Sequence, residues 1–207
     1  ASSPVACFPA TPQYAAGSAT PTQLLSLFSD ITEIKQAEES LRVQAQTDAL
    51  TGLLNRDAIL KQLDIRLQDA ACDRDGLLYV DLDRFKIVND VLGHGAGDEV
   101  LVAAARRMRD AVGSEGLIAR FGGDEFVVVC TCNDDPHRPE RLARRIQHAF
   151  GESFRVDNHE FSVTTSIGIA RAPSDGVTSQ QLIQSADMAM YDRKRRRSNG
   201  WQAFSPE

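Results

Sequence analysis

Two adjacent glycines constrain the fold of this chain more than any other feature. Gly122 and Gly123 stand between an apolar run at 117–118 and a second apolar run at 127–129. Adjacent glycines readily adopt the positive φ angles that a two-residue hairpin turn requires. The pattern therefore predicts two antiparallel strands joined by a tight turn at the glycine pair.

Two carboxylates follow this predicted turn directly. Asp124 and Glu125 are neighbours in the chain, and two neighbouring carboxylates repel each other unless a cation or a proton partner offsets their charge. Taken alone, such a hairpin would be interpreted as a solvated acidic turn. Interpreting it as a binding site requires a second acidic segment beside it.

A second acidic segment ends the apolar run at 77–80. Asp81 and Asp83 lie where this run, which is apolar enough for a buried central strand, changes to alternating carboxylates. Mg²⁺ binds few protein carboxylates and leaves its other positions to water and phosphate oxygens. We therefore expect this strand to neighbour the hairpin, and the two segments to form a site for Mg²⁺ (or Mn²⁺).

Short motifs run through most of the chain in a fixed order. They are DALTGLLNR at 48–56, DLDRFKIVND at 81–90, the pairs Gly93-His94 and Gly97-Asp98, GGDEF at 122–126, SIGIA at 166–170 and ADMAMY at 186–191. Together they resemble the GGDEF domain family, the diguanylate cyclases of bacteria. The resemblance covers about residues 48–199 and implies an α/β fold similar to the palm of nucleotide cyclases and polymerases.

Hydrophobic periodicity predicts the same class, an α/β protein whose mixed central sheet contains an antiparallel hairpin and is flanked by helices. The expected helices cover 55–71, 84–92, 98–112, 139–150 and 179–194, and the expected strands besides the hairpin cover 76–81, 152–156, 160–170 and 201–204. A glycine-rich break at 93–97 separates two helices. It follows a helix rather than a strand, so it is not a dinucleotide-binding loop.

The chain is expected to have three parts. Residues 1–30 begin with a stretch rich in Ala, Ser, Pro and Thr, which suggests a poorly ordered segment or the remnant of a sensor domain. Residues 31–47 form a signalling or linker helix that resembles the exit of a PAS sensor domain, and 48–207 form the GGDEF domain. The linker helix either packs on its own domain or pairs with a second copy in a parallel coiled coil.

Composition restricts the partners. The chain has 207 residues and a net charge of −6, which argues against a nucleic-acid-binding surface. It contains no apolar stretch long enough to span a membrane and no signal-peptide pattern, so we expect a cytoplasmic location, although sequence further upstream could tether it. Cys130 and Cys132 share one face of a predicted strand and are expected to be free thiols rather than zinc ligands.

Asp81 and Asp124 are the predicted metal carboxylates. The resemblance implies the backbone carbonyl of Leu82 as a third ligand, a second Mg²⁺ on Glu125, and removal of the substrate's hydroxyl proton by the carboxylate of Asp124. Asp83 is expected to be a structural carboxylate rather than a ligand.

Phosphate binding is predicted where a helix starts directly after the metal strand. The N–H groups of Arg84, Phe85 and Lys86, together with the helix dipole, can hold phosphate oxygens, and Lys86 adds a full charge. The resemblance implies that Lys194 also reaches the phosphates. The arginine that the family carries four positions later is Ser198 here, a departure from the pattern.

The hydrogen-bonding edge of guanine matches two side chains. One carboxylate can accept both guanine donors and an amide can satisfy its acceptors, which are the roles predicted for Asp98 and Asn89. The resemblance implies that His94 lies near the nucleotide, whereas on its own this residue would be interpreted as a structural histidine at a helix end. Many family members also carry an Arg-x-x-Asp product-inhibition site, and glycines occupy its charged positions here, Gly113 and Gly116.

The resemblance implies a diguanylate cyclase that joins two GTP molecules into cyclic di-GMP and two pyrophosphates at a homodimer interface. The alternative is a catalytically inactive GTP-binding regulatory module of a larger protein. In hybrid proteins such a domain precedes a phosphodiesterase domain, and residues 199–207 look like that junction.

Overall fold

The computed structural model describes residues 45–68, 74–132, 134–156, 159–195 and 200–205, and four short strands before them. The chain divides into two compact units, Ala1–Ala45 and Gln46–Glu207. In the first unit, strand β1 (Val5–Cys7) pairs antiparallel with β4 (Phe28–Asp30), and β2 (Thr11–Tyr14) pairs antiparallel with β3 (Pro21–Leu25). The predicted helix at 31–47 lies outside the described residues except at its last three positions.

The second unit is built on a five-stranded sheet with the order β11-β10-β5-β7-β6. Neighbouring strands are antiparallel except for the parallel pair β10 and β11. Its strands are β5 (Asp75–Leu82), β6 (Leu117–Gly122), β7 (Glu125–Thr131), β10 (Thr165–Arg171) and β11 (Gly200–Ala203). The predicted adjacency of the metal strand and the hairpin is confirmed, because β5 pairs with β7.

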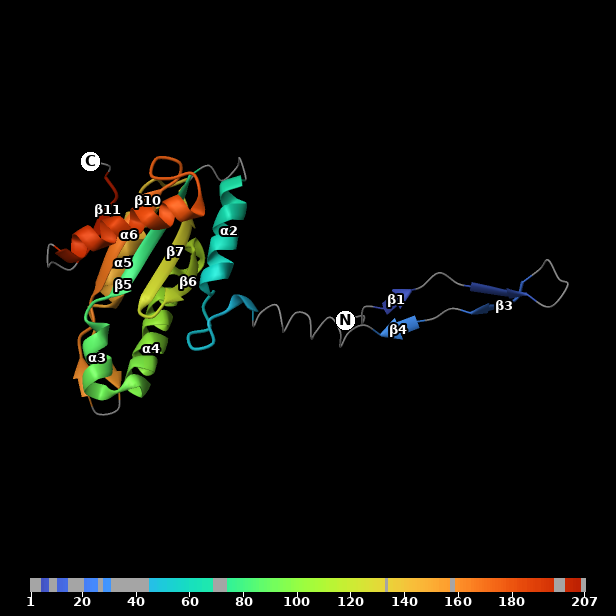
Figure 1. Cartoon of the computed structure of the whole chain (residues 1–207), viewed down its shortest axis with the longest axis horizontal. Helices are drawn as coiled ribbons and strands as arrows, with labels where there is room; N and C mark the ends of the chain where they lie inside the picture. Colours follow the sequence, from blue (N-terminus) through green and yellow to red (C-terminus); the bar gives the residue numbers. More distant parts are fainter. Residues whose placement is uncertain are drawn as a thin grey trace. The chain divides into compact units, whose positions relative to one another are not determined.

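Helices cover both faces of this sheet (Figure 1). They are α2 (Arg56–Gln68), α3 (Phe85–Leu92), α4 (His94–Val112), α5 (Arg138–Ala149) and α6 (Ser179–Arg195), with a short 3₁₀ helix, η2, at Gly113–Glu115. Alternation along β5 sends Leu78 and Val80 to the face packed by α4 and α5, and Leu77 and Tyr79 to the face packed by α2 and α6. Full burial of such a side chain stabilises the fold by about 1.5–3 kcal/mol. The predicted α/β class is confirmed.

The hairpin turn lies one residue later than predicted. Gly122 is the last residue of β6 and pairs with Glu125, the first residue of β7. The turn therefore consists of Gly123, whose φ is 49°, and Asp124. The pairing register shifts between Arg120 and Gly122, which accounts for the displacement. As a result, Asp124 is part of the turn rather than the residue after it.

Two other predicted boundaries were wrong. The break at 93–97 is limited to Gly93, and α4 already begins at His94. Position 97 of the helix requires a glycine, because the side chains of Asn89 and Phe85 occupy the space that a Cβ atom would need. The strand expected at 160–170 is divided into β9 (His159–Phe161), which pairs with β8 (Phe154–Val156), and β10.

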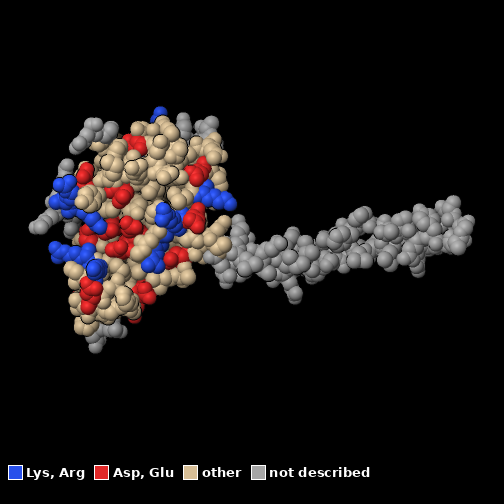
Figure 2. Space-filling model, in the orientation of Figure 1, with Lys and Arg blue, Asp and Glu red and all other residues tan. Residues whose placement is uncertain are grey.

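Three remaining expectations concern thiols, membranes and charge. Cys130 and Cys132 are buried free thiols, as predicted. None of the helices in the described part of the chain is both long and apolar enough to cross a membrane. Acidic and basic side chains are interspersed over the face of the domain in Figure 2.

Candidate functional site

Asp81 lies at the centre of the sheet, next to the end of β5. It is paired with Glu125 of β7 on one side and with Ser166 of β10 on the other. Its side chain shares a face with Leu77 and Tyr79, the face that α2 and α6 cover. Only 7% of the residue is exposed. A carboxylate buried to this extent requires a charged or hydrogen-bonding partner.

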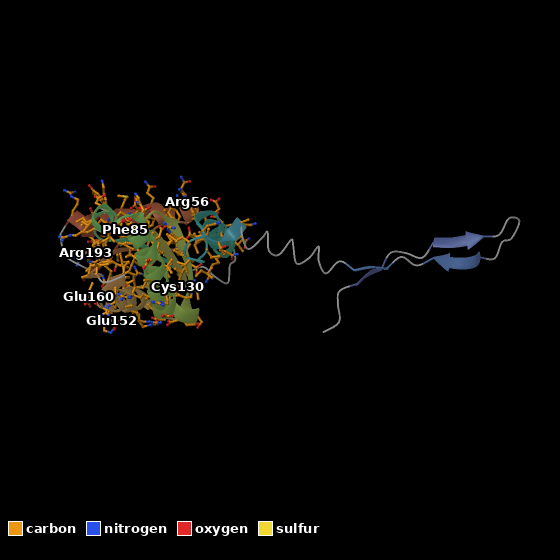
Figure 3. All side chains as sticks on the ribbon, turned by 90° about the horizontal axis from the view of Figure 1, so that it is seen from below. Arg56, Phe85, Cys130, Glu152, Glu160 and Arg193 are labelled. Atoms are coloured by element: carbon orange, nitrogen blue, oxygen red, sulfur yellow. The ribbon has the colours of Figure 1, made fainter. Side chains whose placement is uncertain are left out.

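Lys194, in the last turn of α6, is that partner. Its Nζ lies 2.5 Å from Oδ1 of Asp81, and its own side chain is 37% exposed. Helix α6 can approach the sheet closely because Gly168 of β10 has no side chain, and a Cβ there would collide with the backbone of Ala186 and Met190. Figure 3 labels Arg193, the neighbour of Lys194, toward the same end of the domain as Phe85, the first residue of α3.

The electrostatics of Asp81 reflect its burial first and the like charges around it second. Burial raises the pKa of Asp81 to about 6, although the hydrogen bond and charge of Lys194 lower it. The nearby carboxylates of Asp124 and Asp83 raise the pKa further. Three acidic residues with one lysine among them form a location where additional positive charge is stabilising.

Asp83 and Asp124 are positioned differently around Asp81. The carboxylate of Asp83 accepts hydrogen bonds from the hydroxyls of Thr164 and Ser166, each at 2.7 Å, as expected of a structural carboxylate. Asp124 is anchored through its backbone, since its carbonyl accepts the N–H of Leu82 at 3.2 Å. The turn that carries Asp124 is therefore held at the end of β5.

Glu125 faces a tyrosine. Burial raises the pKa of the Tyr79 phenol, and both the charge of Glu125 and a hydrogen bond to it raise that pKa further. Tyr79 in turn packs edge-on against Phe121, with 5.6 Å between the ring centroids. The hydrogen bond between Tyr79 and Glu125 keeps the Glu125 side chain on the same face of the sheet as Asp81.

Apart from Lys194 on α6, the predicted nucleotide-binding residues lie on the two helices that follow β5. Phe85 is buried at the start of α3, and Lys86 beside it is exposed. Arg84, just before the helix, has a φ of 61°, an uncommon value for a non-glycine residue that turns the chain sharply after β5. The first turn of α3 therefore follows Asp81 by four residues along the chain.

The predicted guanine-binding residues lie across the α3–α4 pair. The side chain of Asn89, on α3, packs against Gly97 of α4, one residue before Asp98. Asp98 and His94 are exposed. Asp98 also borders an open hollow of about 400 Å³ whose other residues include Leu50 and Glu99. The structure therefore brings Asn89 to the start of α4, while Asp98 points to a more open surface.

Sequence reasoning missed the residue that holds the hairpin turn in place. Arg120 donates from Nε to the carbonyl of Gly123 at 2.9 Å and from its NH1 nitrogen to the carboxylate of Asp48 at 3.3 Å. Asp48 also accepts hydrogen bonds from the N–H and hydroxyl of Thr51, at 2.8 and 2.6 Å. A signal is present in the sequence, because Arg120 is a charged residue two positions before the glycine pair of the predicted turn.

The motif at 48–56 binds the edge of the sheet. Leu54 donates its N–H to the carbonyl of Ile118 at 3.3 Å and accepts the N–H of Arg120 at 2.9 Å. The guanidinium of Arg56 lies 4.7 Å from the centre of the Phe121 ring. These contacts fix β6, and through it the turn that carries Asp124.

The donor set fits Mg²⁺ or Mn²⁺. Asp81 and Asp124 offer carboxylate oxygens, the ligand type that both ions prefer, and the crowded charge of Asp81 already attracts an ammonium group. No group of three or more His, Cys, Asp or Glu side chains within the described ranges is arranged to enclose a metal ion. A Mg²⁺ site that relies on substrate phosphates needs only one or two carboxylates.

The fold and the acidic centre define a class. A largely antiparallel sheet that gathers carboxylates at the end of a central strand, beside a hairpin turn, is an α/β domain of the palm type. The family model for "Diguanylate cyclase, GGDEF domain" matches residues 45–200. The chain belongs to the GGDEF domain family.

Similar proteins carry different names. The chain is 37% identical over 179 residues to the cyclic di-GMP phosphodiesterase PdeR of Escherichia coli, covering 86% of this chain and 27% of PdeR. It is 38% identical over 175 residues to the bifunctional diguanylate cyclase/cyclic di-GMP phosphodiesterase MucR of Pseudomonas aeruginosa, covering 84% of this chain and 25% of MucR. The chain thus spans about a quarter of the length of these relatives.

A solved structure supports the fold over most of the second unit. The isolated GGDEF domain of YfiN (TpbB) from Pseudomonas aeruginosa is 37% identical, with a TM-score of 0.72. The match covers 77% of this chain and 94% of the YfiN structure.

Proposed function

We propose that this GGDEF domain is a diguanylate cyclase, which condenses two GTP molecules into cyclic di-GMP and releases two pyrophosphates. The observation that supports the proposal most strongly is the acidic centre at the end of β5. There Asp81 and Asp124 are close enough for their charges to interact, Lys194 pairs with Asp81, and α3 begins four residues after Asp81. A binding site for a metal and a triphosphate needs this combination of charges.

The reaction forms two phosphodiester bonds, and each forms by the same step. The 3′-hydroxyl oxygen of one GTP bonds to the α-phosphorus of the other, and the bond from that phosphorus to the pyrophosphate oxygen breaks. Asp124, whose carboxylate is held near the end of β5 by the turn, takes the proton from the hydroxyl. Mg²⁺ bound by Asp81, Asp124 and the carbonyl of Leu82 would polarise the α-phosphate and neutralise charge on the leaving pyrophosphate.

The triphosphate is bound by backbone and side-chain donors. The N–H groups of Phe85 and Lys86 are unpaired within the first turn of α3, and the positive end of the helix dipole lies with them. The ammonium groups of Lys86 and Lys194 add full charges. Glu125, on the same face as Asp81, is the proposed ligand of a second Mg²⁺.

The base is selected on the α3–α4 pair. Asn89 is the proposed donor to the acceptors of guanine, and Asp98 accepts from its N1–H and N2–H donors. His94, at the start of α4, borders the same site. Adenine lacks this donor edge, so ATP would leave the carboxylate of Asp98 without its partners.

The active form is a homodimer. One domain holds one GTP, and closing the cyclic product requires a second GTP whose 3′-hydroxyl faces the first α-phosphate. The proposed assembly therefore places two acidic centres opposite each other, and the helix predicted from the sequence at 31–47 is one proposed means of holding the copies together.

A catalytically inactive regulatory module is the second candidate. It is favoured by the name of PdeR as a phosphodiesterase and by Ser198 at a position where the family resemblance implies an arginine. Such a module would bind GTP and act on a phosphodiesterase domain in a longer protein.

One assay separates the two candidates. Purified protein is incubated with Mg²⁺ and GTP at several protein concentrations, and cyclic di-GMP is measured by mass spectrometry. We expect product from the native protein and none above background from Asp124→Asn. Asp110→Asn, which removes an exposed carboxylate near the far end of α4, is the matched control and should retain activity. GTP binding without product at any concentration would favour the regulatory module.

A further inference from the structure

We propose that Lys194 occupies the carboxylate of Asp81, the proposed metal ligand, until a divalent ion displaces it, so that metal binding and GTP binding are coupled through its release. The inference rests on the proposed function in one respect, because it takes Asp81 to be a metal ligand. It goes further in giving Lys194 two alternative partners.

The starting point is the ion pair itself. Lys194 Nζ lies 2.5 Å from Oδ1 of Asp81, a distance at which the ammonium group donates a charge-assisted hydrogen bond. Asp81 is almost fully buried, and the neighbouring Asp83 is already bonded to Thr164 and Ser166. The ammonium group thus lies against one of the two carboxylate oxygens that a divalent ion could bind.

A divalent ion and an ammonium group cannot both approach this oxygen closely. At such separations two cations repel each other strongly in a partly buried site. Binding the ion to Asp81 therefore requires Lys194 to move. The lysine can do so, because its side chain is more than one-third exposed and extends from the last turn of α6.

A triphosphate gives the released ammonium group a new anionic partner. The first turn of α3, where the phosphates are proposed to bind, begins four residues after Asp81 and one after Arg84. The ion then binds Asp81 without competition, and Lys194 binds the phosphates. Coupling of this kind is reciprocal, so each ligand strengthens the binding of the other by the same factor.

The first test measures metal binding to the whole chain without nucleotide. Mn²⁺ is titrated into native protein and Lys194→Met, and free Mn²⁺ is followed by electron paramagnetic resonance. We expect Lys194→Met to bind Mn²⁺ about tenfold more tightly, within the usual range of coupling between two sites. Lys194→Arg keeps the charge and should bind like the native protein.

Two controls separate competition from a general charge effect. Arg195→Met removes one positive charge from the same helical turn without touching the ion pair, and should change Mn²⁺ affinity less than about twofold. Lys194→Gln, which keeps a polar side chain, should reproduce the tighter binding if Lys194→Met folds poorly. Equal affinities for the Lys194 and Arg195 variants would overturn the proposal.

The second test observes the ammonium group directly. The lysines of the chain are Lys35, Lys61, Lys86 and Lys194, so ¹³C-dimethylated protein gives few resonances. Adding Mg²⁺ alone should shift the resonance that is missing in Lys194→Met and leave that of Lys61 in place. An unmoved Lys194 resonance at saturating Mg²⁺ would contradict release.

Failure of this inference and failure of the proposed function are distinguishable. A native protein that makes cyclic di-GMP but shows no change in Mn²⁺ affinity on Lys194→Met refutes the coupling alone. A native protein that makes no product but shows the tenfold change refutes catalysis and supports the coupling.

Discussion

The two ends of β5 each hold a buried aspartate, and the two aspartates are held in different ways. Asp75, at the start of the strand, is 1% exposed and pairs with Arg66 of α2 across 2.9 Å. Asp81, at the other end, is 7% exposed and pairs with the partly exposed Lys194 beside two further carboxylates. The start of β5 therefore combines one carboxylate with one guanidinium, whereas the other end combines three carboxylates with one ammonium group.

This difference indicates where the strand is structural and where it is functional. A planar guanidinium on a helix packed against the sheet is a permanent partner for a carboxylate. A flexible lysine at a helix end, shared among crowded acids, is a partner that a divalent ion can replace. Local electrostatics, rather than burial alone, therefore separates the two aspartates.

The largest expected effect is on turnover. Asp81→Asn removes a proposed metal ligand, so cyclic di-GMP formation should fall by about 10³-fold, the order lost when charge stabilisation at a reacting centre is removed. Asp75→Asn, at the other end of β5, should retain turnover per folded molecule. Initial rates of product formation measure both variants. Equal losses in the two would erase the proposed distinction.

The second effect is on stability, for which we expect Asp75→Asn to be the more damaging of the two variants. Asp75→Asn leaves Arg66 without its carboxylate and should lower the free energy of unfolding by about 2–3 kcal/mol, near the lower limit for breaking a buried pair because Arg66 is partly exposed. Asp81→Asn removes the ion pair with Lys194 but also relieves repulsion from nearby carboxylates, so it should lower the free energy of unfolding by less. Urea denaturation of both variants measures this, and a larger loss for Asp81→Asn would contradict the comparison.

The third effect concerns the clamp that places Asp124. Arg120→Met breaks the contacts to Gly123 and Asp48, and the turn should shift relative to the end of β5. We expect about a tenfold to hundredfold loss of turnover, the scale associated with small misplacements of reacting groups. Circular dichroism should show a folded domain. An unchanged rate would show that the turn keeps its position without Arg120.

The fourth effect is a modest pH dependence of stability. Burial alone would raise the pKa of Asp48, but the hydrogen bonds from Thr51 and the charge of Arg120 outweigh it and lower that pKa. The stabilisation is therefore present above the unfolded-state pKa of about 3.9 and is lost as the pH falls through the folded-state value. Asp48→Asn should cost about 1 kcal/mol at pH 6 and progressively less in acid. A constant difference between native and variant protein across this range would rule out the carboxylate as the cause.

The smallest expected effect is of the product on the enzyme. Gly113 and Gly116 carry no charge where many family members have the charged pair that binds product, so added cyclic di-GMP should inhibit turnover weakly or not at all. A product titration during steady-state turnover measures this. Strong inhibition that disappears on substitution around residues 113–116 would contradict the prediction.

Much of the fold could be predicted because its signals are local. The apolar runs at 77–80 and 127–129 indicate buried strands, and their acidic ends correctly placed β5 beside β7. The turn was misplaced by one residue because either glycine of the pair could supply the positive φ. Only the register with β7 shows that Gly123 does so.

The parts that sequence did not reveal depend on contacts between distant segments. Gly97 looked like a helix breaker, although it lies in α4 and accommodates Asn89. Arg120 and Asp48 are 72 positions apart, so neither shows its partner in the sequence. The pairing of Lys194 with Asp81 was likewise hidden, because the family resemblance assigned the lysine to phosphate alone.

The central claim is that Asp81 and Asp124 share one divalent ion beside the nucleotide. The most direct test is a crystal structure with Mn²⁺ and a non-hydrolysable GTP analogue, in which anomalous scattering locates the metal. We predict one Mn²⁺ within about 2.1–2.2 Å of an oxygen from each carboxylate, and Lys194 turned to the phosphates. A metal bound to neither carboxylate, or carboxylates too far apart to share it, would contradict this account.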